Sequence, residues 1–283
     1  MHYTDILVYL DDSEVCEARV ATALAMGEAH DAHVVGVALA IEPTIPAYIG
    51  AELPIEVRDI QRKAAEDAAG KAAEGFKAAA DRAGVSAEAR VVNAYETTAG
   101  ETLAFHARHA DIAILGQSNP DSPLANLTST LAEELLFSSG RPVYLVPYIG
   151  IRPDAVSGGK AIIAWDGGRE SARAVHDALP ILEDMDEVIV LVVDAGKHGY
   201  AHGAEPGADI ATHLARHKIK VRVERVQSAG IDVAEVVLNL IAETGANLLV
   251  MGGYGHSRLR ELALGGVTRT ILKEMTVPVL MSH

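Results

Sequence analysis

The sequence contains a single cysteine, few aromatic residues and fewer basic than acidic residues. The one cysteine, Cys16, cannot form an internal disulfide, which agrees with a reducing compartment. Aromatic residues make up 4% of the 283, so the cores are predicted to consist mainly of Ala, Val, Leu and Ile. The formal charge of −15 argues against a large nucleic-acid surface, because affinity for a polyphosphate backbone comes from clustered Lys and Arg. One small anion remains compatible with this charge, since backbone dipoles and a few basic side chains can hold it.

Two further features are absent: a membrane-length apolar run and the sequence of a fast nucleotide hydrolase. No run approaches the roughly 18 apolar residues of a membrane helix, and the stretch after Met1 lacks the basic-then-apolar pattern of a signal peptide. We therefore expect a cytoplasmic protein without a membrane partner. There is no Walker-type Gly-Lys-Ser/Thr and no obvious set of base and metal-binding carboxylates. We expect a binding protein rather than an enzyme, with slow ATP turnover left open.

The chain is long enough for two domains of about 100 to 200 residues each, and its pattern of elements occurs twice. Apolar runs alternate with helical patterns, as βαβ units with a parallel sheet require. The first half contains predicted strands at 4–10, 33–41, 87–92, 111–115 and 142–147, and helices at 14–30, 55–83, 99–109 and 124–137. The second contains strands at 161–166, 188–194, 221–227, 247–251 and 278–281, and helices at 170–182, 208–217, 233–244 and 267–275.

The two halves can be aligned, which indicates a duplicated domain. Asp11 and Asp166 end the first strand of each half and lie 155 residues apart. Gly116 and Gly252 follow the fourth strands and lie 136 residues apart. The offsets differ because the first half has a longer connection after its second strand, where insertions are tolerated.

The strongest candidate site is the glycine-rich stretch after the fourth strand of the second half. Gly252, Gly255 and Gly265 fit the pattern G-x2-G-x9-G, and Gly265 and Gly266 begin a predicted helix. Glycine lets the backbone approach a ligand closely, and a helix N-terminus favours an anion. Residues 252–273 hold four basic residues and one acidic residue, a net +3, whereas the matching span of the first half has a net −3. The sequence predicts an anion site here, with a tight turn that binds nothing as the structural alternative.

Four segments carry a family likeness: ILVYLDDS at 6–13, AIIAWDGGRESA at 161–172, LLVMGGYGHSRLRELALGGVT at 248–268 and VPVL at 277–280. With them the whole chain resembles a tandem member of the universal stress protein family. The resemblance implies an adenine nucleotide alpha hydrolase-like fold and a cytoplasmic stress-response protein that binds ATP or AMP, with or without Mg²⁺. In nucleotide-binding members the first-strand Asp contacts adenine, and the signature loop holds ribose and phosphates. The nucleotide-binding residues that it implies in this chain are Asp166, Val192, Gly252, Gly255, His256, Gly265, Gly266, Val267 and Thr268.

The chain departs from the family signature in both halves. Gly266 stands where the signature has Ser or Thr, which removes a hydroxyl ligand but keeps the backbone N–H. In the first half Gly116 is kept, but Asn119 and Ser129 replace the second and third glycines. We therefore expect the first half to bind nucleotide poorly or not at all, despite Asp11.

Other interpretations of these residues stay open. Asp11 and Asp166 can each cap the helix that follows. A Gly-Gln-Ser sequence ending at Ser118 imitates part of the G-x-S-x-G turn of serine hydrolases. The spacing of His213 and His217 would let two imidazoles on one helical face bind a metal. We assign neither a catalytic residue nor a metal ligand, and keep as an alternative a stress-induced interaction scaffold that binds no nucleotide.

The predicted architecture is α/β, with two doubly wound, mainly five-stranded parallel sheets in tandem. Residues 1–150 form the domain with the degenerate nucleotide motif, and residues 158–283 form the domain with the G-x2-G-x9-G motif. The closing strands, 143–146 and 277–281, have edges that can pair. By resemblance to family dimers, we expect the two halves to form an internal pseudo-dimer, with a homodimer of the whole chain as a further association.

Overall fold

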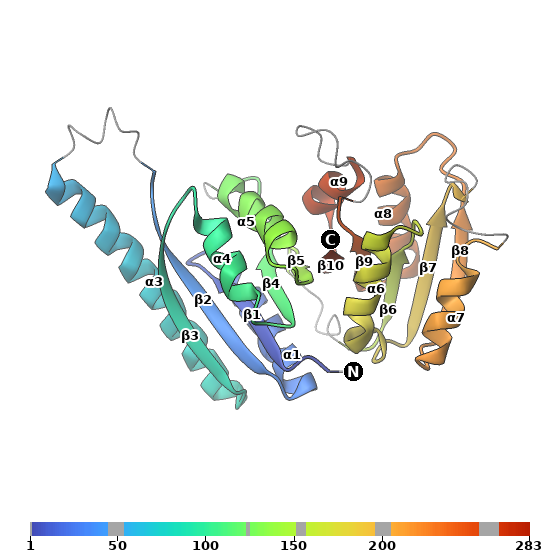
Figure 1. Ribbon diagram of the computed structural model, residues 1–283, viewed down its shortest axis with the longest axis horizontal. Coiled ribbons are helices and arrows are strands. Elements are labelled where there is room, and N and C mark those ends of the chain that lie inside the picture. Colours follow the sequence, from blue (N-terminus) through green and yellow to red (C-terminus); the bar gives the residue numbers. More distant parts are fainter. Residues whose placement is uncertain (1, 45–53, 123–124, 151–156, 196–204, 255–265) are drawn as a thin grey trace. The chain divides into compact units, whose positions relative to one another are not determined.

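The computed structural model describes residues 2–44, 54–122, 125–150, 157–195, 205–254 and 266–283. These residues form two compact units, 2–141 and 142–283, in which strands alternate with helices (Figure 1). The predicted α/β class is confirmed. Within the described ranges, no helix is long and apolar enough to cross a membrane.

Unit 2–141 is built on a parallel sheet in the order β3-β2-β1-β4. Helices α1 and α3 pack against each other on one face of this sheet, and α4 packs against α5 on the other (Figure 1). The strands are β1 (Asp5–Leu10), β2 (His33–Glu42), β3 (Ala87–Tyr95) and β4 (Ile112–Gly116); the helices are α1 (Cys16–His30), α3 (Ile55–Ala83), α4 (Ala99–Ala107) and α5 (Ala125–Ser138).

Unit 142–283 repeats this arrangement with strands in the order β5-β10-β9-β6-β7-β8. All neighbours are parallel except β5 and β10. The strands are β5 (Val143–Val146), β6 (Lys160–Ala164), β7 (Glu187–Val193), β8 (Val221–Val226), β9 (Leu248–Gly252) and β10 (Val279–Ser282); the helices are α6 (Arg169–Leu182), α7 (Ala208–Arg216), α8 (Val233–Thr244) and α9 (Gly266–Glu274).

Local sequence explains why these elements form. The central strands are nearly continuous buried apolar runs, as expected where helices cover both faces of a parallel sheet. Helix α8 has signals at both ends. Its N-cap Asp232 accepts a hydrogen bond from the Ala234 N–H at 2.7 Å, and it ends at Gly245, whose φ of 64° is left-handed.

The closing strands of the two halves pair with each other. β5 runs antiparallel to β10, with Val143 opposite Met281 and Leu145 opposite Val279. The prediction that these edges can pair is therefore confirmed. The pairing also places β5 in unit 142–283, so the compact units hold four and six of the described strands instead of five each. The limits 1–150 and 158–283 stay a prediction about the duplicated sequence.

Each half of the repeat brings the ends of its first and fourth strands together. In unit 142–283, Ala164 of β6 pairs with Met251 of β9, so the chain leaves both strands at the same carboxyl edge just before Asp166 and Gly252. In unit 2–141, β1 and β4 are neighbours in the same way. Ligands of open parallel sheets bind at this edge.

Candidate functional site

Asp166 follows β6 and is held by the start of α6. Its Oδ1 accepts hydrogen bonds from the backbone N–H of Gly168, at 2.8 Å, and from the hydroxyl of Ser171, at 2.6 Å. Gly168 is the N-cap residue of α6, so Asp166 is not the cap itself. Its bonds to the turn and to the first helical turn fix the carboxylate at the carboxyl edge of the sheet.

Gly252 ends β9 and lies directly against the same helix start. A Cβ at Gly252 would come within 2.6 Å of the backbone nitrogen of Ser171 and 2.7 Å of the carbonyl carbon of Glu170, so only glycine fits. Ser171 therefore links two predicted residues, through its hydroxyl to Asp166 and through its backbone to Gly252. Sequence reasoning missed Ser171, although it lies in the quoted first-strand segment.

The turn after Gly252 meets the first turn of α9. The backbone N–H of Tyr254 donates to Oγ1 of Thr268 at 3.3 Å, and Tyr254 has a left-handed φ of 59°. Helix α9 begins at the exposed Gly266, followed by the half-buried Val267 and the buried Thr268. The two ends of the glycine-rich segment thus come together beside the N-terminus of a helix, where free N–H groups and the helix dipole favour an anion.

Val192 is buried in β7 and faces a different neighbour. A Cβ at Gly207, the N-cap of α7, would come within 3.1 Å of Cγ2 of Val192, so this side chain packs beneath α7. The side chain of Val192 is therefore occupied by packing, and only its backbone could contact the base of a nucleotide. Beyond the end of β7, the buried Asp194 accepts hydrogen bonds from the N–H and the hydroxyl of Ser228, at 2.9 and 2.6 Å. This pair, which sequence reasoning missed, ties the ends of β7 and β8 together.

Glu170 places a carboxyl group beside Gly252. It is 6% exposed, and its Oε1 accepts a hydrogen bond from Nε of Arg169 at 2.5 Å. Burial raises the pKa of Glu170, but the Arg169 hydrogen bond, the backbone N–H at the helix start and His283 outweigh it, so the pKa lies below its ordinary value. The Arg169 guanidinium is thus paired with this carboxylate beside Gly252.

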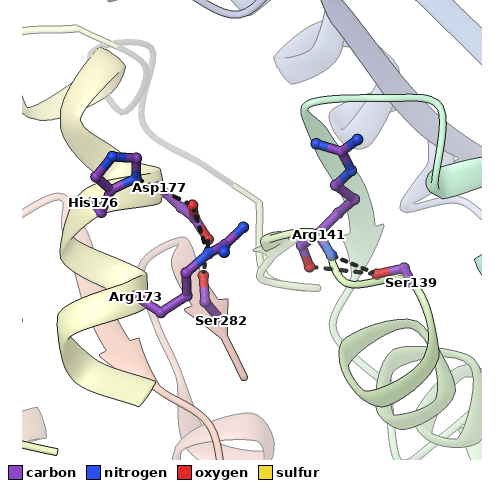
Figure 2. A network of polar contacts seen from close by, with 6 residues as sticks. All are labelled: Ser139, Arg141, Arg173, His176, Asp177 and Ser282. Atoms are coloured by element: carbon purple, nitrogen blue, oxygen red, sulfur yellow. Dashed lines mark hydrogen bonds and ion pairs between the residues drawn. The ribbon is translucent and has the colours of Figure 1, made fainter. Parts of the chain in front are cut away.

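A polar network fixes α6 against the last strand of the unit (Figure 2). Asp177 of α6 accepts hydrogen bonds from the Ser282 hydroxyl, at 2.9 Å, and from Nε of Arg173, at 2.8 Å and 3.0 Å. Nδ1 of His176 lies 3.6 Å from the same carboxylate. Because α6 also supplies Ser171, this network holds the helix that supports the candidate site.

The corresponding edge of unit 2–141 is built differently. Oδ1 of Asp11 lies 2.6 Å from Nη2 of Arg19, whose side chain is 1% exposed. Asp11 also accepts hydrogen bonds from the N–H and the hydroxyl of Ser13. Burial, the largest single influence, lowers the pKa of Arg19, but Asp11 and Cys16 together outweigh it, so the pKa lies above its ordinary value. Asp11 is therefore engaged by an internal cation, which the capping interpretation did not anticipate.

The geometry around Ser118 and around the histidine pair supports neither a hydrolase site nor a metal site. The Ser118 hydroxyl donates to the Ala125 carbonyl at 2.7 Å. The rings of His213 and His217 have centroids 4.9 Å apart, and Nδ1 of His217 lies 3.8 Å from Oε1 of Glu183. In the part of the chain that the structure describes, no three His, Cys, Asp or Glu residues are grouped to hold a metal ion.

Three of the predicted site residues, Gly255, His256 and Gly265, lie outside the described residues. Of the other six, Asp166 and Gly252 both contact Ser171, and Thr268 contacts Tyr254, two residues beyond Gly252. Gly266 and Val267 share the first turn of α9, and Val192 packs beneath α7.

Comparison with known proteins distinguishes the second half of the chain from the first. The model of the universal stress protein family matches residues 159–283. Universal stress protein Slr1230 of Synechocystis sp. is 37% identical over 123 residues, which are 43% of this chain and 41% of that protein. The second half of the chain is thus similar to the universal stress protein family.

Two further relatives extend the likeness. Universal stress protein MJ0577 of Methanocaldococcus jannaschii is 24% identical over 79 residues, 25% of this chain and 49% of that protein. The matches to both curated relatives thus span less than half of their length. The crystal structure of a universal stress protein from Archaeoglobus fulgidus aligns with 98% of this chain and 95% of its own, with a TM-score of 0.71 and 15% identity. The universal stress protein fold therefore extends over both halves.

Proposed function

We propose that the second half binds an adenine nucleotide, ATP or AMP, at the carboxyl edge of its sheet, as a cytoplasmic stress-response protein. The observation that carries the proposal is the contact between the Tyr254 N–H and Thr268 Oγ1, which closes the glycine turn onto the first turn of α9. This is the arrangement that an anion site needs, since N–H groups and a helix dipole converge there. The net +3 of residues 252–273 supports the same conclusion.

The other groups have complementary roles in this proposal. The carboxylate of Asp166, oriented by Gly168 and Ser171, would accept a hydrogen bond from adenine. A Cβ at Gly266 would meet no atom of the described residues within 4 Å, which supports room for a phosphate at the start of α9. Mg²⁺ enters this proposal only as the companion of the phosphates that the family resemblance implies.

We propose a binding protein rather than an enzyme. Neither the described residues nor the sequence offers a base with a metal-binding carboxylate set for phosphoryl transfer. The antiparallel pair of β5 and β10 supports an internal pseudo-dimer of the two halves. A homodimer of the whole chain is the further association that we propose.

A titration tests the proposal, with Trp165 as reporter. Trp165 is the one tryptophan of the chain and directly precedes Asp166, so a nucleotide at this edge should change its fluorescence. Titration with ATP or AMP, followed by fluorescence and calorimetry, should give about one site per chain. Two equal sites would refute the assignment to the second half alone, and no binding would favour the interaction scaffold.

A matched pair of variants locates the site. Gly255→Val should abolish binding, because a branched side chain would fill the space that the signature glycine leaves for a ligand. Asn119→Val, the change at the corresponding position of the first half, should leave binding unchanged. Wild-type affinity in Gly255→Val would show that the glycine stretch is not the nucleotide cradle.

A further inference from the structure

One charged side chain of α1 points into the buried carboxyl edge of unit 2–141. Arg19 is 1% exposed and is among the largest fully buried side chains described. At the 155-residue offset that relates Asp11 to Asp166, the residue of the second half is Ala174, which is fully buried. A guanidinium group therefore lies in the first half where the second half has a methyl group.

Three surfaces enclose this guanidinium. Nη2 lies 2.6 Å from Oδ1 of Asp11, and Cζ lies 5.4 Å from the centroid of the Tyr9 ring, as in a cation–π contact. Nη1 lies where a Cβ at Gly116 would be only 2.6 Å away. Carboxylate, aromatic ring and a backbone without a side chain together match the charge, the flat face and the edge of a guanidinium.

The corresponding groups of the second half both contact Ser171. Asp166 accepts a hydrogen bond from the Ser171 hydroxyl, and Gly252 lies against the Ser171 backbone nitrogen. We infer that the first half contains a guanidinium-binding site that Arg19 fills from within, and that this closes its copy of the ligand edge. The ion pair with Asp11 holds this guanidinium, since Nε and Nη2 of Arg19 have no hydrogen-bond partner among the described residues. The inference does not depend on nucleotide binding by the second half.

Chemical complementation tests the site directly. Arg19→Ala should lower the melting temperature of the full chain by roughly 10 °C, because it leaves Asp11 without its cation. Millimolar guanidinium chloride, compared with equal sodium chloride, should restore several degrees in Arg19→Ala and none in the wild type. Urea, which has the same shape without the charge, should not restore it. An Arg19→Ala variant that responds to guanidinium no differently from the wild type would overturn the inference.

A double-mutant cycle of Gly116 and Arg19 tests whether the guanidinium lies against Gly116, and it needs no added ligand. Gly116→Ala should lower the melting temperature by roughly 4–8 °C, because its Cβ displaces the guanidinium from Asp11. In an Arg19→Ala background the same change should cost almost nothing. If Arg19→Ala does not fold, Arg19→Lys supplies the background, since its ammonium lacks the Nη1 that abuts Gly116.

The same cycle at the second half is the control. Gly252→Ala meets backbone atoms of Ser171 and Glu170, so no side-chain truncation at Ala174 or elsewhere on α6 relieves it. An equal cost of Gly116→Ala with and without Arg19 would show that the guanidinium does not occupy this place, and would refute the inference whatever the second half binds.

Discussion

Gly116 and Gly252 occupy the same position in the repeat but meet different neighbours. A Cβ at either glycine would come within 2.6 Å of a nitrogen atom, which is the Arg19 guanidinium in the first half and the Ser171 backbone in the second. One neighbour is the end of a side chain and the other belongs to the main chain of a helix. The same backbone turn therefore accommodates an internal cation in one half and a helix start in the other.

This difference assigns different roles to equivalent carboxylates. Asp11 neutralises a buried cation, so it contributes mainly to folding. Asp166 accepts hydrogen bonds from the Gly168 N–H and the Ser171 hydroxyl, which orient its carboxylate at the carboxyl edge of the sheet. A duplicated domain can thus keep an aspartate at one position for two unrelated reasons.

The largest expected effect is a difference in stability between variants of Asp11 and Asp166. Asp11→Asn should destabilise the chain by about 3–5 kcal/mol, because it leaves a buried guanidinium without a counter-charge. Asp166→Asn should cost less than about 1 kcal/mol, since the amide oxygen can still accept from Gly168 and Ser171. It should weaken ATP binding by about 10- to 100-fold through the lost charged acceptor for adenine. Urea unfolding and calorimetric titration measure the two quantities.

Asp12→Asn, a change at the exposed neighbour of Asp11, is the control and should leave both quantities unchanged. If Asp11→Asn and Asp166→Asn lose the same stability, the two carboxylates serve one structural purpose and the contrast between the halves fails.

The elements around the second-half candidate site could be predicted from the sequence because their signals are local. The apolar run of β9, the glycines after it and the start of α9 lie within one stretch of chain, and Asp166 follows its strand directly. Arg19 is different, since its partners lie far apart in the sequence: Asp11 follows β1 and Gly116 ends β4. Its signal was a basic residue on a helix face that also buries Val20 and Ala23, which requires a partner inside the protein.

Pairing between distant strands also set strand limits that the sequence did not predict. β3 was predicted to end near Val92, where Asn93 interrupts the apolar pattern, but it continues to Tyr95 because β2 pairs with it as far as Glu42. The observed limits of β5 agree closely with the predicted closing strand. Its assignment to unit 142–283, however, depends on its pairing with β10, which lies far along the chain. Local patterns predict elements, whereas tertiary pairing sets their limits and their unit.

A smaller effect is expected at the junction of the glycine turn with α9. Thr268→Val keeps the size of the side chain but removes the acceptor of the Tyr254 N–H, which should cost about 1 kcal/mol of stability. Loss of the fixed turn should weaken ATP binding by about 5- to 10-fold. Thr270→Val, on the same helix, is the control for the lost hydroxyl. If the two variants bind ATP with equal affinity, this contact does not contribute to the nucleotide site.

The smallest effect compares Asp111 with Asn247, which precede the fourth strand of each half and tie it to the first. Oδ2 of Asp111 accepts from the Thr4 N–H, the Thr4 hydroxyl and the Asp5 N–H, at 2.7, 2.8 and 3.1 Å. Oδ1 of Asn247 accepts from the Lys160 N–H at 2.9 Å. An amide therefore suffices for this link in the second half, and the carboxylate of the first half adds only the benefit of its charge.

Asp111→Asn should accordingly cost only about 0.5–1 kcal/mol at neutral pH, measured by urea unfolding. Burial raises the pKa of Asp111, but the donors on Thr4 and Asp5 outweigh it, so the folded pKa lies below the ordinary value. The stability that the charge adds is thus present above the unfolded pKa and is lost as the pH falls through the folded one. The difference between wild type and variant should vanish in acid, with the exposed Asp121→Asn as control. A difference that persists there would mean that the link depends on the shape of the carboxyl group and not on its charge.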